Sequence, residues 1–382
     1  MSIGRLTLGY SLQPLRGYLK HQTIEHEDER EKDRRTNNMT PTKEQSVEVY
    51  RRMRRIRTFE ERVGEMFVRQ QTAGSMLHLS IAEEAAAVGV THPMREGDSF
   101  TTHHRGHGIF LARGADPKRM MAEIAGKADG YCRGKGGSMH IADRALGHLG
   151  ANAIVGGGIP VVVGAGLSYK VLGKANVSIA FFGDGAMQQG VLYESMNLAA
   201  LWRLPVLFVC VNNQWGMGTR IDRAAANTQF HERARTFGLE GQVVDGSDVF
   251  AVIDIAERLV QGARDGRPAY LSVECYRYYG HARMDKSPYR TPEEETEGRK
   301  RDPVERAIAR LREKEGVTSN ELEAIDKAIA QEMDEAMEYA INAQPPPLTD
   351  LFRDVYDDHE PAPEPLRNRL GRILATNLTA NG

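Results

Sequence analysis

Two apolar segments, each followed by polar residues, constrain the fold more than any other feature of this chain. Residues 177–182 and 205–211 are almost entirely apolar, which is typical of strands buried on both faces of a parallel sheet. Between them, residues 188–203 carry leucines, alanines and a methionine at helical spacing. The sequence therefore predicts a strand–helix–strand unit of roughly thirty residues.

Each predicted strand ends at a polar residue. Asp184, flanked by two glycines, follows the first strand, and Asn213 follows the second. Because crossovers between parallel strands are right-handed, both carboxyl ends meet at one edge of the sheet, where ligands of open α/β sheets bind. A carboxylate and an amide oxygen suit Mg²⁺, glycines allow a diphosphate to approach closely, and a helix beginning near Met187 directs its amide dipoles towards it. The Gly-Asp-Gly motif at residues 183–185 alone is more typical of a tight turn, and the Asn-Asn pair at residues 212–213 alone is more typical of a loop. Together, at the ends of two strands joined by one crossover, they predict a site for a cation and a diphosphate.

The pair resembles the thiamine-diphosphate fingerprint, and its surroundings are similar to the α subunit of the E1 component of 2-oxo acid dehydrogenase complexes, of the pyruvate and acetoin dehydrogenase type. The resemblance covers roughly residues 43–350. It implies an α/β fold, a doubly wound parallel sheet with helices on both faces, and thiamine diphosphate and Mg²⁺ as cofactors. In that family an aspartate, an asparagine and the backbone carbonyl two residues later hold the metal. Those positions are Asp184, Asn213 and Trp215 here.

Three regions are expected along the chain. Residues 1–20 carry only basic charges, and residues 21–35 are dense in glutamate, aspartate and arginine with Ile24 as their one aliphatic residue, which is typical of a disordered extension. A transit peptide and a translation start at Met39 are the alternatives for this region. Residues 41–300 are expected to form the thiamine-diphosphate-binding α/β domain with N-terminal helices and an active-site loop. Residues 301–382 are expected to form C-terminal helices and an irregular tail.

Helical spacing predicts two N-terminal helices, over residues 43–71 and 78–90. The first contains a run of arginines followed directly by glutamates, which is more typical of an ion-paired helix face than of a nucleic-acid surface. The net charge of −2 and the absence of a long apolar run likewise favour neither nucleic acid nor membrane as a partner. The 3 cysteines are far apart, so no disulfide framework or zinc ribbon is predicted. We expect a cytoplasmic protein, or one of an organelle matrix if residues 1–40 are a transit segment.

A histidine-rich turn, His-His-Arg-Gly-His-Gly, spans residues 103–108. No cysteine or carboxylate nearby completes a zinc ligand set, whereas an arginine beside glycines is suited to clamp a phosphate. In the resembling family the residues at His104 and Arg105 contact the cofactor diphosphate. Pyruvate enzymes often carry tyrosine before the arginine, so His104 favours the acetoin-type branch. His107 matches a family histidine near the cofactor.

Two further segments match the family closely. Residues 134–140, Gly-Lys-Gly-Gly-Ser-Met-His, agree with its motif residue for residue, although as a bare pattern they would suit any flexible loop. Residues 150–156 correspond to the family segment that supports the aminopyrimidine end of the cofactor. There Ile154 is expected to bend the cofactor into its V shape, with Val155 beside it and Ala153 in place of a more usual glycine.

Residues 161–166 look like a strand that enters a dinucleotide-binding glycine motif. The third small residue of that motif belongs at position 169, where this chain has Tyr169, whose bulk is incompatible with close helix–strand packing. We therefore predict a helix over residues 160–172 and no nicotinamide binding.

The alternation of strands and helices continues after Asn213. Strands are predicted at residues 242–244 and 269–275, joined by a helix over residues 249–264, and two or three charged helices within residues 303–343.

The polar loop after the last of these strands contains Gly280 and His281. The family histidine at this place comes from a loop that orders over the active site and contacts the diphosphate. Ala282 stands where the animal enzymes carry a regulatory serine, so phosphorylation at that position is not expected.

The resemblance implies decarboxylation of pyruvate or cleavage of acetoin, followed by reductive acylation of a lipoyl group on an E2 partner. The glutamate that acts on the aminopyrimidine is expected to come from a β subunit in an α2β2 assembly. His78, His107 and His281 are the candidate catalytic residues for proton handling and substrate contact. The expected cofactor-binding residues are His104, Arg105, Ala153, Ile154, Val155, Gly183, Asp184, Gly185, Ala186, Asn213, Trp215, Gly216 and His281.

Two other functions remain open on the sequence. One is a related thiamine enzyme, either a branched-chain E1 α subunit or a transketolase-like protein, although residues 137–140 favour the pyruvate or acetoin side. The other is a non-catalytic binding subunit that keeps the fold, against which Asp184, Asn213 and Arg105 argue.

Overall fold

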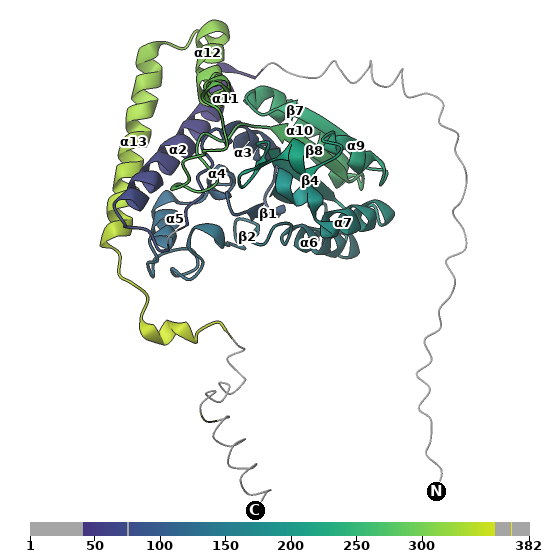
Figure 1. Cartoon of the computed structure of the whole chain (residues 1–382), viewed down its shortest axis with the longest axis horizontal. Coiled ribbons are helices and arrows are strands. Elements are labelled where there is room, and N and C mark those ends of the chain that lie inside the picture. The colour runs from purple at the N-terminus through teal and green to yellow at the C-terminus, as the bar shows by residue number, and fades with distance from the viewer. Residues whose placement is uncertain (1–40, 75, 356–367, 369–382) are drawn as a thin grey trace, which may run out of the picture. The chain divides into compact units, whose positions relative to one another are not determined.

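The computed structural model describes residues 41–74, 76–355 and 368. The expectations for residues 1–40, and for most of the tail beyond residue 355, lie outside these residues. The described chain forms one sheet wrapped by helices, with a layer of longer helices on one side (Figure 1).

The sheet has six parallel strands in the order β2-β1-β3-β4-β8-β7, which confirms the doubly wound α/β class. The strands are β1 Ser99–His103, β2 His148–Asn152, β3 Ser178–Gly183, β4 Val206–Asn212, β7 Glu240–Asp245 and β8 Ala269–Glu274, and a separate two-stranded ribbon pairs β5 Trp215–Gly216 with β6 Thr219–Arg220. The two strands that define the predicted unit, β3 and β4, are direct neighbours. Their carboxyl ends therefore share one edge, as expected.

Helices cover both faces of this sheet. The helices of the described residues are α2 Lys43–Val68, α3 Glu84–Thr91, α4 His107–Ala112, α5 Pro117–Ile124, α6 Ile159–Val171, α7 Gly190–Leu201, α8 Ile221–Ala224, α9 Phe230–Arg235, α10 Val249–Arg264, α11 Pro292–Arg299, α12 Pro303–Glu315 and α13 Ser319–Asn342, with 3₁₀ turns η2 Gly137–Met139, η3 Asp184–Gln188 and η4 Leu348–Leu351. Among the described residues, no helix combines the length and apolar character needed to cross a bilayer.

Alternation along β3 divides the core into two clusters. Ile179 and Phe181 belong to the cluster that contains helices α3 and α10, with α2 and α4 beyond them. Ala180 and Phe182 belong to the cluster under α6, α7 and α9. Successive side chains of a strand point to opposite faces, so a strand that is apolar throughout requires helices on both sides.

Two predicted helix boundaries were wrong. The helix predicted over residues 78–90 begins only at Glu84, because Ser80 donates its backbone N–H and its hydroxyl to the buried Glu60 carboxylate, and Ala82 has a left-handed φ of 76°. The helix after Asp184 begins at Gly190, since a 3₁₀ turn, η3, comes first. In both places the segment beside a buried carboxylate, that of Glu60 or of Asp184, is not α-helical.

The N- and C-terminal helical additions pack on each other, with α13 running alongside α2 and contacting α5 (Figure 1). A buried guanidinium ties this layer to the sheet domain. Arg57 of α2 donates to Glu84 of α3 and to Asp302, the N-cap of α12. Because these carboxylates are nearly excluded from water, they require that positive charge.

The glycines of helix α6 offer a matched pair for a stability test. A Cβ on Gly166 would lie 2.6 Å from Cγ2 of Val206 in β4, whereas a Cβ on Gly164 meets nothing within 4 Å. We expect Gly166→Ala to destabilise the chain by about 1–3 kcal/mol through overpacking, and Gly164→Ala to stabilise it by about 0.5–1 kcal/mol through helix propensity. Urea unfolding of the two variants would contradict this packing if both changed stability equally.

Candidate functional site

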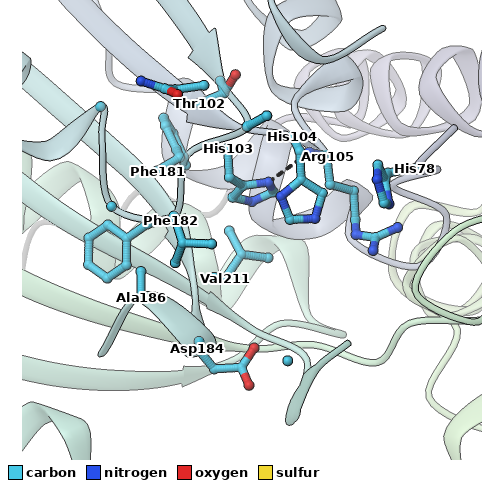
Figure 2. Close-up of a pocket in the computed structure, with 18 of the residues that line it drawn as sticks. His78, Thr102, His103, His104, Arg105, Phe181, Phe182, Asp184, Ala186 and Val211 are labelled. Carbon is cyan, nitrogen blue, oxygen red and sulfur yellow. Dashed lines mark hydrogen bonds between the residues drawn. The ribbon is translucent and has the colours of Figure 1, made fainter. Parts of the chain in front are cut away.

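A cavity of about 430 Å³ opens beyond the carboxyl ends of β1, β3 and β4. Figure 2 shows Arg105 and His78 on one side of it and Asp184 on another. All the residues expected to bind the cofactor line it: His104, Arg105, Ala153, Ile154, Val155, Gly183, Asp184, Gly185, Ala186, Asn213, Trp215, Gly216 and His281. The structure thus brings together segments that are separated by almost 180 positions in the sequence.

Asp184 is the most unusual polar group of the cavity. Its side chain begins the 3₁₀ turn after β3 and is only 2% exposed, yet Oδ2 has no hydrogen-bond partner among the described residues. Burial raises the pKa of Asp184 to about 6, against the opposing effect of a backbone hydrogen bond and nearby arginines. A buried carboxylate oxygen without a partner is costly unless a ligand such as a cation satisfies it.

Asn213 and Trp215 add two further oxygens. Asn213 Nδ2 donates to Oε1 of the buried Glu83 at 2.9 Å, and Asn213 Oδ1 accepts from the backbone N–H of Trp215 at 3.2 Å. The carbonyl oxygen of Trp215 accepts from Arg277 at 3.2 Å. Each of these oxygens accepts one hydrogen bond and keeps a second lone pair. Together with Asp184 Oδ2, this donor set fits a hard cation that prefers oxygen ligands.

The backbone on both sides of Asp184 has free space beside it, at Gly183 and Gly185. A Cβ on Gly183 would meet nothing within 4 Å, and one on Gly185 would only touch Gly216 Cα at 4.0 Å. This part of the backbone can therefore be approached closely by a ligand, as the flanking glycines suggested.

Arg105 is held rigidly at the wall of the cavity. Its guanidinium donates to the carbonyl oxygens of Leu79 at 2.6 Å and His281 at 2.9 Å, and its Nε lies 3.7 Å from Glu83 Oε1. Carbonyl groups and one carboxylate orient the charge without covering it completely. An arginine fixed in this way is preorganised to bind an anion in the cavity.

The sequence interpretation missed Arg277, the second guanidinium of the cavity. It is buried and donates to the carbonyl oxygens of Trp215 and Met217 and to the Tyr289 hydroxyl. Burial, with help from Arg105, lowers its pKa to about 10, so it stays charged at neutral pH. Arg277 lies shortly after the end of β8 at Glu274, so a search for polar residues near strand ends would have included it.

The histidines of the His-rich turn have different partners. His103 accepts from the backbone N–H of Arg105, as the dashed line in Figure 2 marks, and His104 faces the cavity beside His78 and His281. Burial lowers the pKa values of His78 and His281 to about 4 and lowers that of His104 still further. All three rings are therefore neutral at pH 7.

His107 does not line the cavity. It is buried behind it, where Nδ1 lies 3.1 Å from Oε2 of Glu60 and Nε2 lies 2.9 Å from Oγ of Ser138. Glu60 was also missed, since one glutamate within a charged helix carries no sequence signal. This geometry suits His107 for positioning the Ser138 segment rather than for touching a ligand.

The glycine-rich segment that ends at residue 140 is wrapped around one buried side chain. Glu123 of α5 accepts four backbone N–H groups, from Cys132, Gly134, Gly136 and Gly137, at 2.7–3.0 Å. These four N–H groups already donate to Glu123 and so do not bind a ligand in the cavity. The loop is instead a rigid support for Met139 at the cavity wall. Glu123 lies outside the segment and could not be connected with it from the sequence.

His148 of β2 makes the stability of this region depend on pH. It is 1% exposed, its ring stacks on Phe100, and burial lowers its pKa to about 3. The unfolded chain protonates this group below its ordinary pKa of about 6.5, while the folded chain does not. The contribution of His148 to the free energy of unfolding is therefore fully present above pH 6.5. It decreases by about 1.4 kcal/mol per pH unit as the pH drops below that value.

We expect His148→Asn to remove this contribution, so that its free energy of unfolding falls less steeply between pH 6.5 and pH 5, by about 1.4 kcal/mol per unit. Urea titrations at several pH values measure the slope, and His140→Asn, at an exposed position, is the control. Equal slopes for wild type and His148→Asn would contradict the buried neutral state.

Comparison with known proteins agrees with the sequence resemblance. The family model "Dehydrogenase E1 component" matches residues 51–349. The α subunits named acetoin:2,6-dichlorophenolindophenol oxidoreductase are 44% identical in Cupriavidus necator, over 82% of this chain and 95% of the relative, and 41% identical in Bacillus subtilis, over 84% and 96%. The pyruvate dehydrogenase E1 component subunit alpha of Rhizobium meliloti is 39% identical over 82% of this chain and 90% of the relative.

Proposed function

The chain belongs to the dehydrogenase E1 component family, as an α subunit of the pyruvate and acetoin dehydrogenase type, and we propose that it binds thiamine diphosphate and Mg²⁺ and acts together with a β subunit. In this proposal the assembled enzyme decarboxylates pyruvate or cleaves acetoin and then reductively acylates the lipoyl group of an E2 partner. The observation that carries the proposal is the buried oxygen of Asp184, which has no partner among the residues that the structure describes and lies in the same cavity as Asn213 and Arg105.

We assign the metal to three oxygens: a carboxylate oxygen of Asp184, Oδ1 of Asn213 and the carbonyl oxygen of Trp215. Glu83 supports this assignment because it accepts a hydrogen bond from Nδ2 of Asn213, while the backbone N–H of Trp215 donates to Oδ1, and together these contacts fix which atom of that side chain is the oxygen. A carboxylate with neutral oxygens is a typical donor set for Mg²⁺, which completes its shell with water and phosphate oxygens.

The diphosphate is assigned to the cationic wall. Arg105 and Arg277 supply two fixed positive charges, and the neutral rings of His104 and His281 can donate hydrogen bonds. Gly183, Gly185 and Gly216 leave room for the ligand near Asp184, and Ala186 lines the cavity beside them. Both charge and space therefore favour the diphosphate at this end of the cavity.

Another part of the cavity wall is apolar. Ala153, Ile154 and Val155 line it, and the last two are 72% and 49% exposed. Bound thiamine diphosphate would supply the carbanion chemistry of the reaction. Our assignment gives these three residues the role of supporting the ring end of the cofactor, with Ile154 as the apolar wedge.

A partner chain is needed for acid–base chemistry at the ring end. Of the described residues that line the cavity, Asp184 alone carries a carboxyl group, and the metal assignment uses it. A glutamate from a β subunit would fill this role, and the exposed Ile154 and Val155 would be covered by the same contact. This is the argument for an α2β2 assembly with the cofactor between the subunits.

His78 and His281 are our candidates for proton handling. Both line the cavity, and their lowered pKa values keep both rings neutral at pH 7, so each ring has one N–H and one nitrogen with a free lone pair. His107 acts through Ser138 and is assigned a positioning role. Acetoin is the first substrate to test, because a relative with acetoin in its name is 44% identical, against 41% and 39% for two relatives named pyruvate dehydrogenase.

The test is co-expression with the cognate β chain, followed by assays with acetoin, pyruvate and 3-methyl-2-oxobutanoate and dichlorophenolindophenol as electron acceptor. We expect turnover of acetoin or pyruvate by the α–β complex and none by the α chain alone. Preference for the branched substrate would instead favour a branched-chain E1. If calorimetry found no magnesium-dependent binding of thiamine diphosphate to the complex, a non-catalytic binding subunit would replace the proposal.

A further inference from the structure

Three histidines from distant segments meet in the cavity. His78 lies between α2 and α3, His104 follows β1, and His281 lies in the loop after β8. One nitrogen of each ring lies within 4.8 Å of the corresponding nitrogens of the other two. The ring centroids of His78 are 4.5 Å from His104 and 4.6 Å from His281. Neighbouring imidazoles in one water-accessible cavity form a potential ligand set for a metal that prefers nitrogen.

The tautomer of His78 is fixed. Its Nδ1 lies 2.7 Å from the carbonyl oxygen of His281, and a carbonyl can only accept, so Nδ1 carries the hydrogen. Nε2 therefore has a free lone pair. A histidine that donates one N–H to a carbonyl while its other nitrogen is free has the arrangement typical of metal-binding histidines.

The other two rings are also available. Among the described residues, no hydrogen bond occupies a ring nitrogen of His104 or His281, and neither ring has a buried nitrogen without a partner. Their lowered pKa values mean that a metal ion has no proton to displace at pH 7.

We propose that His78, His104 and His281 form a binding site for one transition-metal ion of the zinc class, separate from the Mg²⁺ assigned to Asp184. Imidazole ligands suit Zn²⁺, Co²⁺, Ni²⁺ and Cu²⁺, whereas Mg²⁺ prefers oxygen, so the two sites select different metals. Three histidines leave a fourth position for water, as in open zinc sites.

Small ring movements would complete the geometry. Zn–N bonds of 2.0–2.1 Å in a tetrahedral site place ligand nitrogens roughly 3.3 Å apart, so each ring has to move inwards by about 1 Å. Hydrogen bonds to Asp285, Arg105 and His78 hold the backbone of His281, so its ring has to move by rotation of the side chain.

Charge limits the affinity. Arg105 and Arg277 line the same cavity, and Glu83, 3.7 Å from Arg105, offsets only part of their charge. A dication next to these guanidinium groups is bound more weakly than at a three-histidine site without them. We therefore expect micromolar rather than nanomolar affinity for Zn²⁺.

The site has a functional consequence that rests on the proposed function. The metal would occupy space that our assignment gives to the diphosphate, next to Arg105 and His281. Zinc-class ions would then inhibit the enzyme by competing with thiamine diphosphate. His104, in place of the tyrosine expected in pyruvate enzymes, would make this chain more sensitive to these ions, because tyrosine does not supply the third imidazole.

The first experiment measures Co²⁺ binding to the full-length chain without cofactor. We expect the visible absorption of tetrahedral Co²⁺, displaceable by Zn²⁺, and a loss of at least about tenfold in affinity in His104→Tyr and in His78→Gln. His92→Ala, at an exposed histidine outside the cavity, is the control and should bind like wild type. Circular dichroism checks that each variant is folded. Equal Co²⁺ affinity and equal spectra in wild type and folded His104→Tyr would overturn the site.

The second experiment adds thiamine diphosphate with Mg²⁺ to the Co²⁺-loaded chain and to the α–β complex. Release of Co²⁺ supports a shared location, and retention of Co²⁺ by a complex that binds the cofactor overturns the competition. Failure of the proposed function is distinguishable, because a complex that binds no thiamine diphosphate would still bind Co²⁺ through His104.

Discussion

Replacing Asp184 with asparagine is expected to weaken magnesium-dependent binding of thiamine diphosphate to the α–β complex by at least about 100-fold, or about 2.7 kcal/mol. Of the described residues lining the cavity, Asp184 alone carries a carboxyl group, and its Oδ2 has no protein partner. An asparagine of the same shape keeps the packing but removes the negative charge that a divalent cation requires.

The same substitution should stabilise the chain without cofactor, by about 1–3 kcal/mol at neutral pH, because burial disfavours the charged carboxylate, whereas the asparagine amide carries no charge. Function and stability would then change in opposite directions, which is the signature of a binding residue and not of a structural one. Calorimetry of the complex and urea unfolding of the free chain measure the two effects. Asp222→Asn, at an exposed aspartate, is the control. Full cofactor affinity in Asp184→Asn would contradict the metal assignment.

Glu123→Ala is expected to cause a large loss of stability. Its carboxylate accepts four backbone N–H groups, so the substitution leaves Cys132, Gly134, Gly136 and Gly137 without their acceptor in a partly buried loop. At about 1–3 kcal/mol for each unsatisfied buried group, and with water replacing some of the contacts, we expect a loss of about 4 kcal/mol or more.

Glu123→Gln provides the matched intermediate. Its carbonyl oxygen can still accept two of the four N–H groups, while its amide group faces the other two donors, so the loss of stability should be smaller than in the alanine variant. Glu297→Ala, at an exposed glutamate, should change stability by less than about 0.5 kcal/mol. Urea unfolding measures all three variants. If Glu123→Ala were as mild as Glu297→Ala, the loop would not depend on this carboxylate.

Much of the sheet could be predicted because its signals are local. The apolar runs of β3 and β4, the helix between them and the handedness of the crossover placed Asp184 and Asn213 at one edge. β1 and β2 were missed, because Ser-Phe-Thr-Thr-His and His-Leu-Gly-Ala-Asn are short and lack a buried apolar pattern. Their strand conformation comes from pairing with β3 and with each other, which is a tertiary effect.

By itself the sequence determined the α/β class, the polar ends of two neighbouring strands and, through its motifs, the segments that line the cavity. Only the tertiary structure decided that Glu123 holds the glycine-rich loop, that His107 lies behind the cavity, and that His78 and His281 meet 203 positions apart. The physical reason is the range of the interactions. Strand pairing and helix periodicity act between neighbours in sequence, whereas a buried carboxylate or imidazole takes its partners from whichever segments the packed core brings beside it.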